Sequence, residues 1–237
     1  MKPLAIDLFC GLGGWTQGLL AEGYYVVGFD IERHEYGTGG YPAQLVLQDV
    51  LTIHGEQFKD AALIVASPPC QFFSYCAMPW SRAKKLAAEV RADPERMNSE
   101  LALFRTCFRI QREAIEAAGH FIPLVVENVR GAQKWVGRSR WNFGSYYLWG
   151  DVPALMPMTK RATKSSRPNR GGVMAWTTGH LEGYWESTDG SKNPGFRFDG
   201  SGATGSKSSA RKAASAAIAK IPFALARYIA ATYKPKA

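Results

Sequence analysis

Short apolar runs alternate with amphipathic segments along the first half of the chain. The runs with strand character cover residues 4–8, 24–30, 45–47, 63–66 and 122–126. They are continuous rather than alternating, which is typical of parallel strands covered on both faces. A helical pattern at 15–22 separates the first two runs, and strand, helix, strand at this spacing indicates a parallel sheet. We therefore predict an α/β fold built on a doubly wound, mostly parallel sheet.

A longer amphipathic segment lies between the last two of these runs. Its apolar residues recur at three-, four- and seven-residue spacings: Met97, Leu101, Phe104, Phe108 and Ile115. Charged residues occupy the other positions, which predicts a helix with one buried face. This helix is expected to be the crossover between the two strands.

The residue composition of the chain changes after Gly150. Residues 151–206 are rich in glycine, serine and basic residues, which predicts loops or a small irregular region. Residues 207–237 return to helix formers interrupted at Pro222, so two short helices are expected there. Their apolar positions suit docking onto the first 150 residues: Ile218, Ile221, Leu225 and Ile229. The predicted organisation is thus 1–150, 151–206 and 207–237.

Composition narrows the class of partner. The 237 residues carry 29 Lys and Arg against 20 Asp and Glu, a net charge of +9, which favours a polyanionic partner, nucleic acid before a membrane surface. No window approaches the roughly 20 apolar residues of a membrane span. The four cysteines show no zinc-ligand spacing and are too few for a disulfide framework, so no metal is expected. We expect a cytoplasmic protein.

A glycine-rich turn follows the first predicted strand, in residues 7–14 (DLFCGLGG). Glycines there let the backbone approach a ligand, and the next helix presents free N–H groups. Asp30 ends the following strand, 19 positions after Gly11, where a carboxylate can accept hydrogen bonds from ribose hydroxyls. The pattern indicates a nucleoside cofactor. Thr16 replaces the third glycine of the NAD motif, and a purely structural turn is the alternative.

A cysteine follows another apolar run, within residues 66–74 (ASPPCQFFS). Cys70 would lie just outside the carboxyl end of a strand, where open α/β sheets bind ligands, on a loop stiffened by two prolines. This position favours a nucleophile. A buried structural thiol is the alternative, and it is the preferred interpretation for Cys76 and Cys107, which lack such a setting.

An acid ends a third apolar run, in residues 125–129 (VVENV). Glu127 could simply cap or pair at a strand end. Beside Cys70 it would place an acid next to a nucleophile, the pairing needed for addition to a polarised ring.

These three elements, in this order, resemble the DNA (cytosine-5) methyltransferase family. The residues that carry the resemblance are DLFCGLGG at 7–14, PPCQFFS at 68–74 and ENV at 127–129. The resemblance implies a sheet of the Rossmann-like type found in S-adenosylmethionine-dependent methyltransferases. It also implies that a cytosine flips out of duplex DNA into the pocket. Cys70 would attack C6 while Glu127 holds the N3 and amino edge, so that C5 accepts a methyl group from S-adenosylmethionine.

The resemblance also implies the remaining site residues. For the cofactor these are Phe9, Gly11, Gly13, Gly14, Asp30, Ile31, Asp49, Val50 and Pro69. For the substrate they are Gln71, Ser74, Asn128 and Arg138, with Arg140 as a catalytic residue.

The sequence departs from the family in three places. Arg138 and Arg140 follow ENV within about a dozen residues, much sooner than the usual arginine pair, and residues 218–222 lack the expected asparagine. The target-recognition region would be confined to 151–206. Its basic residues could neutralise phosphates: Arg161, Lys164, Arg167 and Arg170.

The sequence therefore predicts a monomeric DNA cytosine-5 methyltransferase, with a restriction-modification role among those open to it. Two alternatives remain: the same chemistry on RNA, and a non-catalytic DNA-binding relative. Net charge does not separate DNA from RNA, because both are polyanions.

Overall fold

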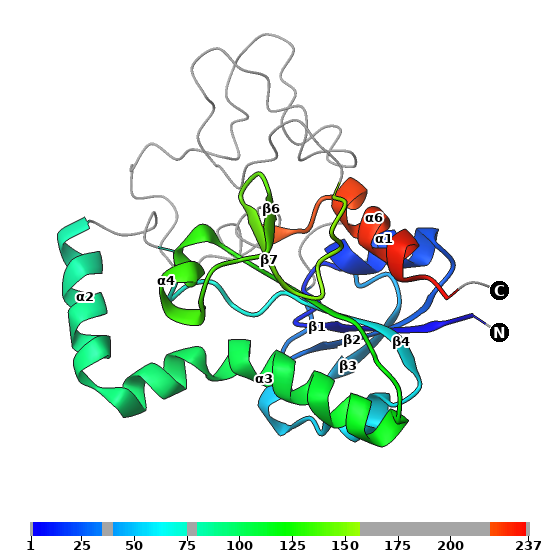
Figure 1. The fold of residues 1–237 in the computed structure, drawn as a ribbon, viewed down its shortest axis with the longest axis horizontal. Coiled ribbons are helices and arrows are strands. Elements are labelled where there is room, and N and C mark those ends of the chain that lie inside the picture. Colours follow the sequence, from blue (N-terminus) through cyan, green and yellow to red (C-terminus); the bar gives the residue numbers. More distant parts are fainter. Residues whose placement is uncertain (1, 35–39, 75–79, 157–218, 236–237) are drawn as a thin grey trace, which may run out of the picture.

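The computed structural model describes residues 2–34, 40–74, 80–156 and 219–235. They form one sheet in the order β3-β2-β1-β4-β5-β7-β6 (Figure 1). The strands are β1 Leu4–Leu8, β2 Tyr25–Asp30, β3 Gln44–Leu47, β4 Ala61–Ala66, β5 Leu124–Asn128, β6 Trp141–Phe143 and β7 Tyr146–Gly150. The first five strands pair in parallel, as in β1 with β2 and with β4. The predicted mostly parallel α/β fold is confirmed.

The β6–β7 hairpin adds the antiparallel part of the sheet. Strand β7 pairs with β5 and β6, and Glu127 lies opposite Leu148. The sequence did not indicate these strands, because β6 has only three residues and β7 is a short aromatic run. Their position depends on the exposed edge of β5, which is a tertiary feature.

Helices cover both faces of the sheet. They are α1 Gly14–Ala21, α2 Trp80–Ala92, α3 Pro94–Ala118, α4 Gln133–Val136 and α6 Phe223–Tyr233, with 3-10 turns η1 Val50–Thr52, η2 Gly55–Phe58 and η4 Arg130–Ala132. Helix α3 lies on one face, and α1 with α6 on the other (Figure 1). None of the helices in these ranges is both long and apolar enough to cross a membrane.

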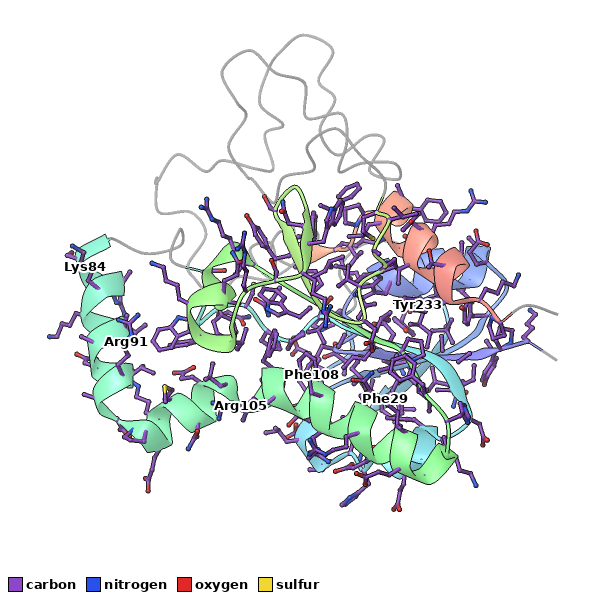
Figure 2. All side chains as sticks on the ribbon, in the orientation of Figure 1. Phe29, Lys84, Arg91, Arg105, Phe108 and Tyr233 are labelled. Atoms are coloured by element: carbon purple, nitrogen blue, oxygen red, sulfur yellow. The ribbon has the colours of Figure 1, made fainter. Side chains whose placement is uncertain are left out.

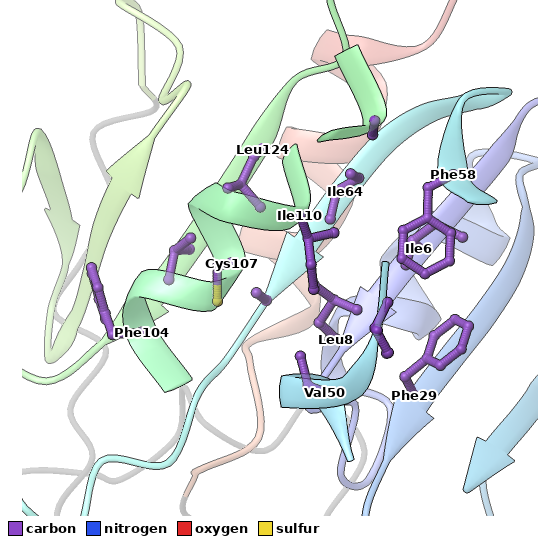
Figure 3. Packing of buried hydrophobic residues seen from close by; sticks show 14 of the residues in the cluster. Ile6, Leu8, Phe29, Val50, Phe58, Ile64, Phe104, Cys107, Ile110 and Leu124 are labelled. Atoms are coloured by element: carbon purple, nitrogen blue, oxygen red, sulfur yellow. The ribbon is translucent and has the colours of Figure 1, made fainter. Parts of the chain in front are cut away.

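Helix α3 is the predicted crossover. The Asp93 side chain caps its first turn by accepting the N–H groups of Glu95 and Arg96, each at 3.0 Å, and Gly119 ends it in a left-handed conformation. Its Cys107 and Ile110 pack onto Leu124 and the other strands beneath (Figure 3). The predicted apolar face is thus confirmed as the face that covers the sheet.

The C-terminal helix α6 packs against α1 on the opposite face. Ile221, Leu225 and Ile229 are all buried there, as the sequence predicted, whereas Ile218 lies outside the described residues. The two helices approach closely at Gly18, where a Cβ atom would lie 2.5 Å from the carbonyl carbon of Ala226. Residues 157–218, which include most of the predicted recognition region with Arg161 and Arg170, also lie outside the described part.

Substituting Gly18 with alanine tests this helix contact. Alanine favours an isolated helix by about 1 kcal/mol over glycine. Because the new methyl group would meet backbone atoms, we expect the opposite sign, a loss of roughly 1–3 kcal/mol in the free energy of unfolding by urea. Gln17→Ala is the matched control and is expected to change stability by less than about 0.5 kcal/mol. A Gly18→Ala protein as stable as the control would contradict the contact.

Candidate active site

The candidate site lies where the strand order reverses. Strand β1 has β2 on one side and β4 on the other, so the segments that leave the carboxyl ends of β1 and β4 diverge from the same point. The amide of Ser67, just after β4, donates to the carbonyl of Leu8 at 3.1 Å. Open α/β sheets bind ligands in the crevice at such a switch point. Both motifs predicted from the sequence, the glycine turn and the cysteine loop, begin there.

The glycine turn bends sharply between β1 and α1. Phe9 has a φ of 57°, unusual for a non-glycine residue, and Gly11 and Gly13 have φ values of 48° and 72°. A Cβ at Gly11 would meet nothing within 4 Å, so the turn is open on that side. A Cβ at Gly14 would lie 2.5 Å from the amide nitrogen of Ile221, so this glycine admits the segment before α6. The backbone of the turn is therefore open to a ligand at Gly11, whereas at Gly14 it packs against the backbone of Ile221.

Asp30 joins the turn to the end of β2. One carboxylate oxygen accepts the N–H of Gly11 at 2.9 Å, and the other accepts the N–H of Ile31 at 2.8 Å. The oxygen that accepts from Gly11 retains a second acceptor site, whereas the other also lies 3.4 Å from the amide nitrogen of Glu32 and 3.4 Å from Nε2 of His34. The Ile31 side chain is 73% exposed, so an apolar surface stands beside the carboxylate. The structure thus brings together Gly11, Asp30 and Ile31, three of the predicted cofactor residues.

The segment after β3 lies beside Asp30. The amide of Gln48 donates to the carbonyl of Asp30 at 2.8 Å. The Asp49 carboxylate accepts the N–H of Leu51 at 2.9 Å and caps η1, while Val50 is 2% exposed and belongs to the core. Val50 could therefore reach a ligand only through its backbone. Acidic Asp30, Asp49 and apolar Ile31 fit an adenosine group, whose hydroxyls and amine are donors and whose base is flat and apolar.

A buried hydrogen-bond chain lies beneath the turn. The Thr16 hydroxyl donates to the Asp7 carboxyl at 2.6 Å, and the Tyr41 hydroxyl lies 2.5 Å from that of Thr16. The other Asp7 oxygen, Oδ1, is buried with no hydrogen-bond partner. Burial raises the pKa of Asp7 to about 8, with the Thr16 hydrogen bonds opposing the shift. Burial also raises the pKa of the Tyr41 hydroxyl and of the Cys10 thiol.

The part played by Tyr41 was not predicted from the sequence. A Cβ at Gly28 would overlap the Tyr41 hydroxyl, and one at Gly13 would lie 2.7 Å from the Pro42 ring. Residues 41 and 42 thus pack against both β2 and the glycine turn. Gly28 was the available signal, because a glycine inside a strand often marks the close approach of another group.

Cys70 is the accessible member of the described cysteines. It is partly exposed, whereas Cys10 and Cys107 are buried. Burial raises the pKa of the Cys107 thiol, which suits a structural role. The Cys70 carbonyl accepts the amide of Phe73 at 3.0 Å, so the loop turns directly after the thiol. Cys76 lies outside the described residues.

Glu127 and Asn128 end the neighbouring strand β5. Their exposed fractions are 3% and 0%. The Asn128 side chain donates to the carbonyl of Pro68 at 2.9 Å and accepts the amide of Val129 at 2.8 Å, so it holds the cysteine loop against β5. Its predicted contact with substrate stays a prediction. Ser67, whose hydroxyl accepts the Trp15 indole N–H at 3.0 Å, leads into the same loop.

The surroundings of Glu127 include a buried tyrosine. Burial raises the pKa of Tyr146, and the charge of Glu127 raises it further. The Tyr146 hydroxyl donates to the carbonyl of Lys220 at 3.1 Å, which ties β7 to the segment before α6. The lysine itself has a lowered pKa because it is partly buried. Glu127 is thus buried near a tyrosine whose hydroxyl joins β7 to the segment before α6.

The remaining predicted residues occupy the rim. Pro69 and Gln71 are exposed on either side of Cys70, and Ser74 is half-buried. Arg138 and Arg140 are exposed just before β6, and the amide of Arg140 donates to Leu148, the residue opposite Glu127. Arg140 is therefore separated from Glu127 by two strand spacings, roughly 10 Å.

Replacing Asp7 with asparagine tests the protonated state of this carboxyl. Its folded pKa of about 8 exceeds the unfolded value, so its contribution to stability is full below about pH 4 and decreases as the pH rises towards 8. Relative to wild type, Asp7→Asn should gain stability over that interval, by up to about 1.4 kcal/mol per pH unit. Urea unfolding between pH 5 and 8 measures this difference. The exposed control Asp60→Asn should show no such trend, and parallel wild-type and Asp7→Asn profiles would mean that Asp7 is ionised.

Comparison with known proteins gives a family match for the first part of the chain. Residues 4–90 match the family model of the C-5 cytosine-specific DNA methylases. No match was found among curated proteins. The match covers the glycine turn, Asp30, Asp49 and Cys70, and it ends before Glu127.

Several solved structures share part of the fold. The Dnmt2 methyltransferase of S. pombe has a TM-score of 0.36 and 16% identity over 58% of this chain and 37% of that chain. The methyltransferase EhMeth of Entamoeba histolytica has a TM-score of 0.40 and 16% identity over 71% and 62%. A protein assigned as a DNA modification methyltransferase of an E. coli prophage has a TM-score of 0.36 and 23% identity over 57% and 35%. The chain spans less than two thirds of each.

Proposed function

From the match of residues 4–90 to the family model of the C-5 cytosine-specific DNA methylases, we propose that this chain transfers a methyl group from S-adenosylmethionine to C5 of a cytosine in duplex DNA. One observation carries the proposal. Cys70 is an accessible thiol at the carboxyl end of β4, one strand from Glu127 and across the switch point from the glycine turn. The proposed nucleophile, acid and nucleoside-binding turn are therefore all carried by segments at the carboxyl ends of neighbouring strands.

The cysteine performs the covalent step. C5 of cytosine is a poor nucleophile, and addition of the Cys70 thiolate to C6 forms an S–C6 bond and moves electron density to C5 and N3. Glu127 would donate a proton or hydrogen bond at N3, which neutralises the charge that develops on the ring. C5 would then take the methyl group as the methyl–sulfur bond of the donor breaks, and loss of the C5 proton to water would break the S–C6 bond and release the thiolate. Asn128 fixes the loop on which the thiol stands by holding the carbonyl of Pro68.

The proposed cofactor residues Asp30 and Ile31 lie on the side of β1 opposite to the Cys70 loop. S-adenosylmethionine, when bound, supplies an electrophilic methyl group. Asp30 would accept a ribose hydroxyl at the second acceptor site of the oxygen bonded to Gly11, and the exposed Ile31 side chain would pack on the base. The open side of Gly11 leaves room for the ligand to approach the backbone. The described residues thus fit the group chemically.

Removing the Cys70 thiol tests the covalent mechanism. Cys70→Ala should lower incorporation of labelled methyl groups into a cytosine-containing duplex by at least about 10³-fold, because the variant lacks the thiol that forms the covalent bond to C6. Cys107→Ala, a buried cysteine on α3, is the matched control and should retain activity. An unchanged rate for Cys70→Ala would refute the mechanism. Methylation of a structured RNA in preference to the duplex would favour the RNA alternative.

Removing the Asp30 carboxylate tests the cofactor site. Asp30→Ala should raise the dissociation constant for S-adenosylmethionine by about 10- to 100-fold, since hydrogen bonds to a charged group contribute about 1.5–3 kcal/mol. Isothermal titration calorimetry measures the constant, and thermal unfolding confirms that the variant is folded. Glu32→Ala, an exposed acid two residues further on, is the control and should bind as wild type. Equal affinities for Asp30→Ala and wild type would exclude this place for the ribose.

A further inference from the structure

Exposed cations are concentrated in two segments near the Cys70 loop, helix α2 and residues 130–150. Helix α2 carries four basic residues and one acid, Glu89, and residues 130–150 carry four basic residues and no acid. In the second segment the exposed cations are Arg130, Lys134, Arg138 and Arg140. Such a local excess attracts a polyanion more strongly than the average charge of the chain does.

A tryptophan connects these elements to the nucleophile loop. The Trp135 ring of α4 lies 4.8 Å, centroid to centroid, from Phe72, two residues after Cys70. The Arg91 guanidinium of α2 lies over the same ring, 5.0 Å from its centroid. Figure 2 shows Arg91 on the side of α2 that faces α4. The loop, α4 and α2 therefore share one aromatic contact, and cations on either helix are held at a defined place relative to Cys70.

Four exposed cations lie on the elements that meet at this contact. Lys84 is seven residues before Arg91 and so lies on the same flank of α2, since seven residues complete nearly two helical turns. Ala83, Ala87 and Val90 are buried and form the packed stripe of the helix. Beyond Trp135, Lys134 and Arg130 are four residues apart on consecutive turns. We name Lys84, Arg91, Arg130 and Lys134 the basic rim.

Among the described residues, the acids on α2 and at the start of α3 are Glu89, Asp93 and Glu95. Asp93 and Glu95 stand at the bend between α2 and α3, where Asp93 caps α3, and Glu89 pairs with Arg96 at 3.5 Å. Glu89 is five residues from Lys84 and two from Arg91, so it lies on another side of α2. The rim between α2 and α4 is therefore bounded by acids at the bend and is cationic next to the cysteine loop.

We propose that the basic rim binds the phosphate backbone of duplex DNA on the α2 side of the Cys70 loop and so presents the target nucleotide to the thiol. The inference rests on the proposed function for its choice of DNA as the polyanion. Helices α2 and α4 would bind phosphates around the Cys70 loop. Such contacts position a duplex without recognising its sequence, because phosphate contacts set register and orientation. Trp135 would keep the two sets of cations and the loop in one arrangement.

Charge removal on the full chain tests the rim. The variant combines Lys84→Gln, Arg130→Gln and Lys134→Gln. The matched control combines Lys2→Gln, Lys59→Gln and Arg112→Gln, three exposed cations on other elements, with the same loss of charge. Binding of a fluorescein-labelled DNA duplex is measured by anisotropy at several salt concentrations. The rim variant should bind at least about tenfold more weakly at low salt, with a salt slope smaller by about 2–3, whereas the control slope should change by less than about 1.

Binding and catalysis are read separately on the same preparations. Equal losses in the rim and control variants, or wild-type binding by the rim variant, would overturn the rim as the DNA contact even if methyl transfer is observed. A rim-specific loss in a protein that methylates nothing would support the rim and count against the proposed function. A rim-dependent preference for an RNA duplex over the DNA duplex would overturn the choice of DNA.

Discussion

The parallel pairing of β1 with β2 on one side and β4 on the other is the constraint on which the site depends. Parallel strands place their carboxyl ends along one edge, and the reversal of strand order at β1 sends the connecting segments away in opposite directions. The glycine turn and the Cys70 loop consequently leave the sheet from neighbouring strand ends on the same edge.

At this edge of the sheet, some polar side chains bind neighbouring residues, whereas others remain accessible. Asn128 and Trp15 use their polar groups on the Pro68 carbonyl and the Ser67 hydroxyl, which fixes the path into the cysteine loop. Cys70 remains partly exposed, and the Asp30 oxygen bonded to Gly11 keeps a second acceptor site. A rigid frame of this kind suits chemistry in which the base and the methyl donor must meet in one orientation.

Burying the Asp7 carboxyl beneath the glycine turn costs free energy. A carboxyl with one unpartnered oxygen in the core is destabilising when charged, which is why its pKa is raised to about 8. In its protonated form it accepts from Thr16, and Thr16 in turn contacts Tyr41. These hydrogen bonds attach the segment after β2 to the first turn of α1. At neutral pH the Asp7 carboxyl beneath the glycine turn is therefore mostly uncharged, which is the form that costs less to bury.

Much of the frame could be predicted from local pattern. Continuous apolar runs indicated β1, β2, β3, β4 and β5, and the spacing of residues 97–115 indicated α3, because burial on two faces or on one stripe leaves a direct mark on residue order. The approach of Gly11 to Asp30 was also predictable, since both follow neighbouring parallel strands. Helix α2 was not predicted, because its apolar stripe of Ala83, Ala87 and Val90 is narrow and its composition is mostly charged or small.

The sequence by itself determined the strand and helix periods, the glycine turn and the residue types at Cys70 and Glu127, since each depends on near neighbours in the chain. Only the tertiary structure decided the β6–β7 hairpin on the edge of β5, the Tyr41 hydroxyl against Gly28, and the Trp135 ring between Phe72 and Arg91. These contacts join segments far apart in the sequence or carried by different elements. Their partners are chosen by shape, burial and charge in three dimensions, which no local pattern records.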